Sequence, residues 1–216
     1  MSSLRDLVPH VALVAPAMAE PLIVECLRES FDELARRTRC WLVEPDAVDV
    51  EEGEPRYKAP VSGGLVLVRV EEVRLLGAGT VGGAKLDPEN VPDWFRDTED
   101  WESASGIPYG YAQVTPDTIV LNAVPAMGGS TWTLRFKLSV RCGFSTADIP
   151  NSLMADQWHT IVAGAKAAAL ILPGPSFNER LAVIERAKYE AEVSKLTWRV
   201  AKGFVSSGPA TRAAFF

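Results

Sequence analysis

Hydrophobic residues recur at helical spacing near the start of the chain. Glu20 and Pro21 open this stretch, and proline is favoured in the first turn of a helix. Apolar side chains then form one stripe while charged side chains cover the opposite side, which predicts an amphipathic helix of about five turns. The stripe contains Ile23, Cys26, Leu27, Phe31 and Leu34.

The longest helical pattern covers residues 151–204 and is broken at Pro173-Gly174-Pro175. The pattern before the break predicts a helix over 152–172, with Asn151 as its N-cap. Most side chains over 163–169 are alanine, which has the highest helix propensity and is small enough to let a second helix approach closely. Because Pro173 cannot continue this helix, the two halves are expected to form a helical hairpin.

The helix after the break is predicted to begin at Ser176, because Ser176 and Glu179 have the spacing of a capping box. About 28 residues would make a helix of roughly 40 Å, which exceeds a typical globular helix. It is either a core helix of an ordinary domain or a spine, that is, a long helix that spans a neighbouring subunit. Ion pairs are expected across one turn at Glu185–Lys188 and Glu192–Lys195. Its apolar stripe contains Leu181, Ile184, Ala187, Ala191 and Trp198, broadened by Val183 and Leu196.

Between residues 41 and 142 the pattern changes to the two-residue alternation of β-strands. The clearest case is Thr131–Val140, where apolar residues alternate with polar and basic ones, as in a half-buried antiparallel strand with a basic outer face. Further strands are predicted at Trp41–Val43, Val48–Val50, Gly64–Leu76, Tyr109–Val114 and Thr118–Leu121.

This order of elements predicts an α+β fold. The simplest architecture is a helical bundle, made of the N-terminal helix plus the long C-terminal helical hairpin, with an inserted antiparallel β-domain. The expected parts are residues 1–40 as the N-terminal helical part, 41–148 as the β-rich domain, 149–204 as the hairpin that completes the bundle, and 205–216 as an extended C-terminal tail.

Composition and charge narrow the functional classes. A net charge of −6 and a pI near 5.1 argue against nucleic-acid binding. The apolar stretch within 152–172 is too short to span a membrane, and Asp156, His159 and Lys166 interrupt it. We therefore expect neither specific DNA binding nor membrane insertion.

The sequence offers weak signals for cofactors and metals. Residues 77–82, Gly-Ala-Gly-Thr-Val-Gly, match the dinucleotide fingerprint, but another turn follows and no helical period. Because a bound pyrophosphate sits at a helix N-terminus, a flexible glycine-rich loop is the favoured interpretation, and we predict no cofactor. The cysteines lack metal-ligand spacing, which predicts no metal site and suggests reduced thiols in a cytoplasmic setting. They are Cys26, Cys40 and Cys142.

The candidate catalytic residues lie on one predicted helix. A nucleophilic triad of Ser152, Asp156 and His159 would need these groups to converge beside an oxyanion hole, which side chains on one regular helix rarely do. We therefore predict that the protein is not an enzyme and has no catalytic residues. A deep pocket lined by His159, Asp156 and Tyr109 would instead favour a small-ligand-binding or enzymatic module.

The last residues of the chain have an unusual composition. Residues 205–216 are rich in serine, glycine, proline and alanine, and they end in two phenylalanines. This segment is either a frayed terminus or a docking peptide that orders on a partner. The predicted partner-binding residues of the docking peptide are Phe204, Arg212, Phe215 and Phe216.

Short segments along most of the chain carry one family resemblance. They are Arg36-Arg37-Thr38-Arg39-Cys40-Trp41, Val43-Glu44-Pro45, Ser105-Gly106-Ile107-Pro108-Tyr109, Ile149-Pro150-Asn151-Ser152-Leu153, Trp158-His159-Thr160-Ile161-Val162-Ala163-Gly164-Ala165 and Leu172-Pro173-Gly174-Pro175-Ser176-Phe177. Together they resemble the head-to-tail adaptor (connector) proteins of tailed phages, which form a ring under the portal. These segments are structural patterns and not active-site signatures.

The resemblance implies a structural virion protein at the neck of the particle, made in the host cytoplasm. Many copies would form a homo-oligomeric ring between the portal protein and tail or nozzle proteins, with the docking residues in a C-terminal arm that embraces the portal. DNA would pass through the ring without specific binding. A tail-terminator or tail-completion protein, which would bind the tail tube, is the alternative virion role.

Overall fold

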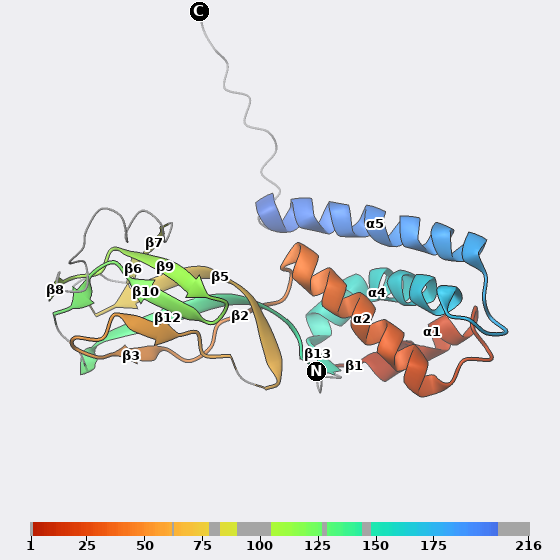
Figure 1. The fold of residues 1–216 in the computed structure, drawn as a ribbon, viewed down its shortest axis with the longest axis horizontal. Helices are drawn as coiled ribbons and strands as arrows, with labels where there is room; N and C mark the ends of the chain where they lie inside the picture. The colour runs from red at the N-terminus through yellow and green to blue at the C-terminus, as the bar shows by residue number, and fades with distance from the viewer. Residues whose placement is uncertain are drawn as a thin grey trace, which may run out of the picture. The chain divides into compact units, whose positions relative to one another are not determined.

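The computed structural model of the protein describes residues 2–61, 63–77, 83–89, 105–126, 129–143 and 148–202. The fold is α+β, with helices and mainly antiparallel sheets, and the predicted class is confirmed (Figure 1). The chain divides into two compact units. Met1–Cys40 together with Ala147–Phe216 form the helical unit, and Trp41–Thr146 form the β unit. In sequence, the β unit is therefore inserted into the helical unit.

In the helical unit, α2, α4 and α5 pack against one another, and β1 pairs antiparallel with β13. None of the helices in the described residues combines the length and apolar character that crossing a bilayer requires. The elements are β1 (Ser2–Ser3), η1 (Leu4–Leu7), α1 (Val8–Ala12), α2 (Glu20–Thr38), β13 (Asp148–Ile149), α4 (Asn151–Ile171) and α5 (Glu179–Lys202).

Helix α2 forms where the sequence predicts it and buries the predicted stripe. Pro21 lies in its first turn, and the helix ends where Arg39 adopts a left-handed conformation with φ of 55°. The amide of Arg39 donates to the carbonyl of Ala35 at 2.9 Å, which satisfies one of the free carbonyls of the last turn. Its buried residues include Ile23, Cys26, Leu27, Phe31 and Leu34.

Helix α4 has nearly the predicted bounds, but the predicted N-cap is wrong. Asn151 is the first helical residue, and its Oδ1 accepts a hydrogen bond from the hydroxyl of Ser2 at 2.8 Å. Pro150 occupies the cap position and makes no side-chain cap bond. The β1–β13 pair places Ser2 opposite Ile149, so a contact between distant residues has replaced the local one.

Helix α5 begins at Glu179, later than predicted. Ser176 lies in the preceding turn, and the amide of Leu181 donates to the Oδ1 of Asn178 at 3.0 Å. The capping-box prediction at Ser176 is therefore wrong, and Asn178 is the cap. The amide of Asn178 also donates to the carbonyl of Leu170 at 3.0 Å, which holds the turn against the end of α4.

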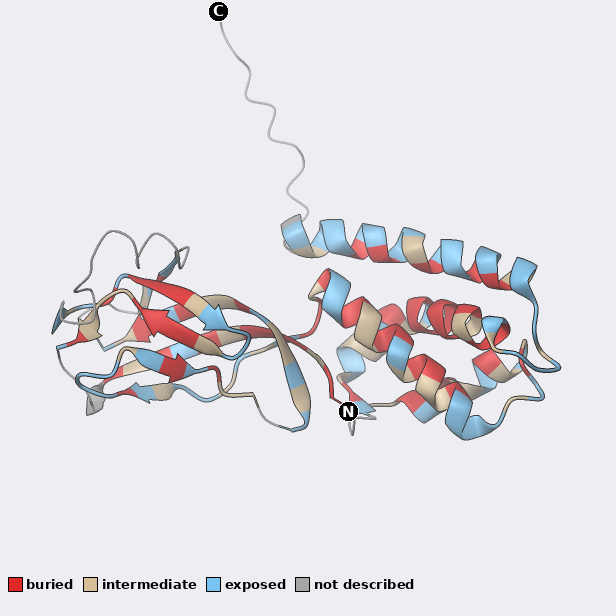
Figure 2. Ribbon diagram, viewed as in Figure 1, coloured by how far each residue is buried: buried red, intermediate tan, exposed pale blue. Residues whose placement is uncertain are grey.

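The predicted apolar stripe of α5 is only partly buried: Leu196 is buried, but most of the stripe is exposed. Val183, Ile184 and Trp198 are 63%, 47% and 67% exposed, and Ala187 and Ala191 are exposed as well. Figure 2 shows buried residues on the side of α5 toward α4 and exposed residues on the opposite side. The residues that α5 buries are Ala182, Glu185, Tyr189, Val193 and Leu196.

Tyr189 lies at the centre of the contact among α2, α4 and α5. Its side chain is fully buried, and its hydroxyl donates to the carbonyl of Ser30 at 3.1 Å. The hydroxyl of Ser30 donates in turn to the carbonyl of Ile161 at 2.9 Å. Gly164 leaves the space for both, because a Cβ there would lie 2.8 Å from Cδ2 of Tyr189 and closer still to Oγ of Ser30.

The β unit contains two larger sheets and a short parallel pair in its described residues. One sheet has the order β2-β12-β5-β6, with β3 also paired to β12, and the other has the order β4-β10-β9-β7. The strands are β2 (Leu42–Val43), β3 (Val48–Val50), β4 (Arg56–Lys58), β5 (Leu65–Leu76), β6 (Ala84–Lys85), β7 (Asp87–Pro88), β8 (Ser105–Gly106), β9 (Gly110–Thr115), β10 (Thr118–Leu121), β11 (Val124–Pro125) and β12 (Gly129–Cys142).

Strand β12 confirms the predicted alternation on its inner face. On the outer face Arg135 is exposed as expected, but Ser139 is buried and its hydroxyl donates to the carbonyl of Arg69 at 3.2 Å. Strand β5 pairs along β12 with two register shifts, and each bulge reverses the face on which later side chains lie. The buried inner residues of β12 are Trp132, Leu134, Phe136, Leu138 and Val140.

Candidate interaction site

The predicted docking residues Phe204, Arg212, Phe215 and Phe216 lie outside the described residues. The structure therefore leaves this prediction untested. The glycine-rich segment 77–82 lies between β5 and β6, which pair antiparallel with Leu75 opposite Ala84. The segment leads into a strand and not into a helix, so the helix N-terminus that a dinucleotide motif needs does not follow it.

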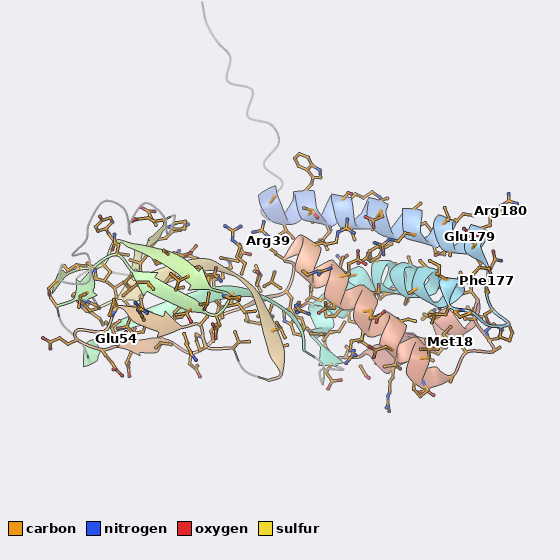
Figure 3. All side chains as sticks on the ribbon, viewed as in Figure 1. Met18, Arg39, Glu54, Phe177, Glu179 and Arg180 are labelled. Carbon is orange, nitrogen blue, oxygen red and sulfur yellow. The ribbon has the colours of Figure 1, made fainter. Side chains whose placement is uncertain are left out.

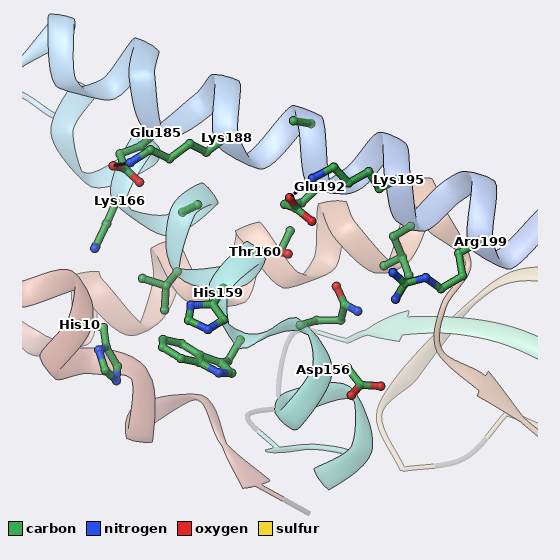
Figure 4. Close-up of a pocket in the computed structure, with 16 residues that line it drawn as sticks. His10, Asp156, His159, Thr160, Lys166, Glu185, Lys188, Glu192, Lys195 and Arg199 are labelled. Atoms are coloured by element: carbon green, nitrogen blue, oxygen red, sulfur yellow. Dashed lines mark hydrogen bonds and ion pairs between the residues drawn. The ribbon is translucent and has the colours of Figure 1, made fainter. Parts of the chain in front are cut away.

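The helical unit carries a pocket of about 830 Å³ that is lined by α4, α5 and one residue of α1 (Figure 4). The sequence singled out two of its residues, Asp156 and His159. It also predicted the ion pairs Glu185–Lys188 and Glu192–Lys195, but not that these residues share a pocket with α4, because α4 and α5 are separate helices and His10 lies far away in the chain. The charged residues and histidines of the lining are His10, Asp156, His159, Lys166, Glu185, Lys188, Glu192, Lys195 and Arg199.

Trp158 joins two histidines along one wall of the pocket. The ring centroids of His10 and Trp158 are 5.0 Å apart with a tilt of 38°, and those of Trp158 and His159 are 3.4 Å apart with a tilt of 29°. Ring pairs in tilted and stacked arrangements attract one another beyond the apolar area that they bury. The contact of His10 with Trp158 therefore holds α1 against α4.

Ion pairs neutralise much of the charge in the pocket. Lys188 donates to Glu185 and Lys195 donates to Glu192, both at 2.6 Å, so the two predicted pairs are confirmed. Glu185 is buried, whereas the lysine of each pair is exposed. The lining therefore presents a mixed surface of nearly balanced charge.

The pocket does not bring a nucleophile and a base together. Asp156 and His159 point apart along α4 (Figure 4), and no hydrogen bond joins them in the described part of the chain. Ser152 does not line the pocket, and Tyr109 belongs to the β unit. Thr160 is the one hydroxyl side chain of the lining, and it is buried. Nucleophilic catalysis requires such groups within hydrogen-bonding reach.

The second candidate is the α5 outer face, which we define as Ile184, Ala187, Ala191, Ser194 and Trp198. These residues recur every three or four positions and therefore form one row along the helix. Arg180, at the start of α5, points away from α4 on the same side (Figure 3). The row is mainly apolar, with the exposed side chains of Ile184 and Trp198 at its ends, and an exposed apolar patch is typical of an interaction site. The sequence pattern located four of these residues, all except Ser194, as one stripe, and it left open whether that stripe faces the core or a neighbouring subunit.

A cluster of four charged side chains ties α2 to α5 beside Tyr189. Nη2 of Arg186 lies 2.7 Å from Glu33 Oε1 and 2.7 Å from Glu190 Oε1. Arg37 bonds both carboxylates, at 3.0 Å to Glu33 and 2.7 Å to Glu190. The hydrogen bond from Arg186 lowers the pKa of Glu33, and the hydrogen bond from Arg37 lowers the pKa of Glu190. The guanidinium of Arg186 also lies 5.0 Å from the centroid of the Tyr189 ring.

The cluster predicts acid sensitivity of the helical unit. Because both glutamates have lowered pKa values when folded, their stabilisation is present above the unfolded value of about 4.3 and is lost as the pH falls through the folded values. We expect the melting temperature to fall on acidification below pH ~4, and to fall less in the variant Glu33→Gln/Glu190→Gln. Thermal unfolding followed by circular dichroism measures both.

The variant Glu29→Gln is the matched control, because Glu29 is an exposed residue of α2 outside the cluster. It should keep the acid sensitivity of the unchanged protein. Equal acid sensitivity of the control and of Glu33→Gln/Glu190→Gln would show that the cluster is not its source.

No protein-family model matches the sequence, and no curated protein matches it significantly. The function is therefore inferred from the residues and faces described above and from the segment resemblance.

Proposed function

We propose that the protein is a structural component of a tailed-phage virion, a head-to-tail adaptor whose copies form a ring between portal and tail. The observation that carries the proposal is the second apolar face of α5. The helix packs Tyr189 against the core, yet Ile184 and Trp198 remain exposed on the opposite side. A helix that is apolar on opposite sides is typical of one covered on both sides. This favours the spine between subunits over an ordinary core helix.

The segments that resemble adaptor proteins give further support. Three of them coincide with ends of elements in the helical unit: 36–41 spans the end of α2, 149–153 the start of α4, and 172–177 the turn before α5. A fourth, 105–109, includes Ile107 and Tyr109, which are 59% and 69% exposed. The longest segment, 158–165, differs, because it lies within α4 and its residues 160–165 are buried. The resemblance therefore lies in residues at helix ends, in exposed residues and in part of the helical core.

The charge of the chain is compatible with a channel for DNA. A basic wall would bind phosphates and retard the passage of DNA, whereas an acidic chain avoids this retention. In this proposal the ring contacts the portal protein on one side and tail or nozzle proteins on the other, in the neck of the virion. Salt-sensitive binding of DNA by the purified protein would argue against this role.

The test is co-expression with the portal protein of the same phage, followed by electron microscopy of the purified complex. An additional ring at the narrow end of the portal is the expected result. A protein that binds the tail tube and not the portal would be a tail-completion protein. A protein that binds neither would contradict both virion roles.

Removal of residues 205–216 is expected to abolish binding to the portal while leaving the melting temperature unchanged. A docking peptide that orders only on its partner adds little to the core of the free protein, and the removed segment carries three of the four predicted docking residues, Arg212, Phe215 and Phe216. Co-purification with tagged portal protein measures binding, and circular dichroism measures folding. The matched control is Phe215→Leu/Phe216→Leu, which keeps apolar side chains and should retain part of the binding. Full binding by the truncated protein would contradict the docking role.

A further inference from the structure

We infer that the α5 outer face of one copy packs antiparallel against the outer face of α2 in the next copy. The inference rests on the proposed function only in that the next copy is taken to be the neighbouring subunit of the ring. It is argued from the surfaces of the helical unit alone.

The α5 outer face resembles a surface onto which a second helix packs, because small residues lie at its centre and charged residues lie along its border. Ala187, Ala191 and Ser194 form a low centre, and the large side chains of Ile184 and Trp198 stand at either end. Small residues in such a row allow a second helix to come close. Lys188 and Lys195 border the row, with their side chains 60% and 66% exposed. Each lysine already holds a glutamate of α5, but an exposed ammonium group carries three donors and can bond a second carboxylate, so the row fits a helix that carries acidic side chains.

The outer face of α2 has the complementary character. Leu22 is 44% exposed, and Glu25, Glu29 and Asp32 follow it at spacings of three or four residues along the same side of the helix. Arg28 and Arg36 also lie toward this side, and Arg28 pairs with Glu25. Leu13, at the end of α1, adds a side chain that is 79% exposed.

An antiparallel alignment matches four positions of the two faces, and it sets Ile184 opposite Arg36. Glu25 and Asp32 are seven residues apart, as are Lys188 and Lys195, so both pairs span about 10 Å of helix. The alignment that sets Glu25 opposite Lys195 also sets Asp32 opposite Lys188. It brings Leu22 opposite Trp198 and Glu29 opposite Ala191, so large apolar groups meet and a long side chain faces a small one.

The contact has to form between copies. Within one chain α2 and α5 already contact each other through other sides, where Arg37 of α2 pairs with Glu190 of α5. The outer faces are two different patches on the same unit, and such a head-to-tail contact repeats into a ring or a filament. Two α5 outer faces paired antiparallel would instead oppose Lys188 to Lys195, and like charges disfavour that arrangement.

Disulfide cross-linking of the full chain tests the contact. One variant carries Ala191→Cys and a second carries Glu29→Cys, and the purified proteins are oxidised alone and mixed. We expect a cross-linked dimer in the mixture only. The native cysteines are buried and free, and burial raises the pKa of the Cys26 and Cys40 thiols, so the unchanged protein is the blank.

The matched control replaces Ala191→Cys by Thr197→Cys, an exposed residue of α5 outside its outer face, and should give no dimer with Glu29→Cys. A dimer of Ala191→Cys alone would overturn the proposal in favour of pairing between two α5 helices. Absence of any cross-link at about 1 mM protein, where even a millimolar contact is populated, would also overturn it.

The portal experiment gives a separate answer. Cross-linking without portal binding would keep the contact and reject the adaptor role. A portal-bound ring whose copies do not cross-link, by contrast, would keep the role and reject the contact.

Discussion

Replacing Tyr189 with alanine is expected to lower the free energy of unfolding of the helical unit by about 3–5 kcal/mol, the usual cost of removing a buried aromatic ring. The ring is fully buried where α2, α4 and α5 meet, and few other side chains in the described core are as large. Because a domain of this size is stable by only about 5–15 kcal/mol, the loss should bring the unit near the limit of folding. Urea unfolding followed by circular dichroism measures it.

Two variants separate the contribution of the Tyr189 ring from that of its hydroxyl and from that of the exposed face of α5. Tyr189→Phe removes only the hydroxyl that donates to Ser30, and it should cost about 1 kcal/mol. Trp198→Ala removes a larger ring from the exposed side of α5, and at low protein concentration it should change stability by less than about 0.5 kcal/mol. A cost for Trp198→Ala as large as that for Tyr189→Ala would show that α5 packs through the face that the sequence pattern predicted.

The two faces of α5 illustrate what a single sequence leaves undecided. Helical periodicity identifies an apolar stripe, but α5 carries two, and the pattern does not say which one meets the core. The structure selects the Tyr189 stripe because its ring fits above Gly164 and its hydroxyl reaches Ser30. In α2 only one stripe is apolar, so the same reasoning correctly predicts its buried residues.

Elements with a long period were predictable, and the short strand β3 was also predicted at Val48–Val50, but other short strands and contacts between distant residues were not. β12 is 14 residues long and its alternation holds over its inner face, but β4, β6 and β7 have two or three residues and offer no period to detect. The N-cap predictions failed at Asn151 because Ser2, far away in sequence, takes its side-chain oxygen. Local signals lose to tertiary contacts at such ends.

The candidate sites likewise contain residues that the sequence pattern identified and contacts between distant residues that it did not. The sequence pointed to Asp156 and His159, and both line the pocket, but the contact of Trp158 with His10 depends on how α1 meets α4. The charged cluster of α2 and α5 joins residues about 150 positions apart, such as Glu33 and Arg186, which no spacing rule connects. The exposed row of α5 was visible as a pattern, and only its exposure required the structure.

Replacing Gly164 with leucine is expected to lower the free energy of unfolding by about 3 kcal/mol, at the upper end of the usual cost of overpacking. A Cβ at this position already lies 2.8 Å from Cδ2 of Tyr189, so a larger side chain must push α5 away from α4. The matched control is Gly174→Leu, because a Cβ at Gly174 meets no atom within 4 Å. The control should unfold like the unchanged protein, and an equal loss in both variants would reject the steric explanation.

Combining the two core substitutions tests whether the glycine and the tyrosine are coupled. Leucine at 164 occupies part of the space that Tyr189→Ala empties, so the double variant should be more stable than the sum of the single losses by about 1–3 kcal/mol. Urea unfolding of the unchanged protein, Gly164→Leu, Tyr189→Ala and the double variant completes this double-mutant cycle. Strict additivity would mean that Gly164 and Tyr189 do not share one packing site, and the account of why α5 turns its other apolar face outward would then fail.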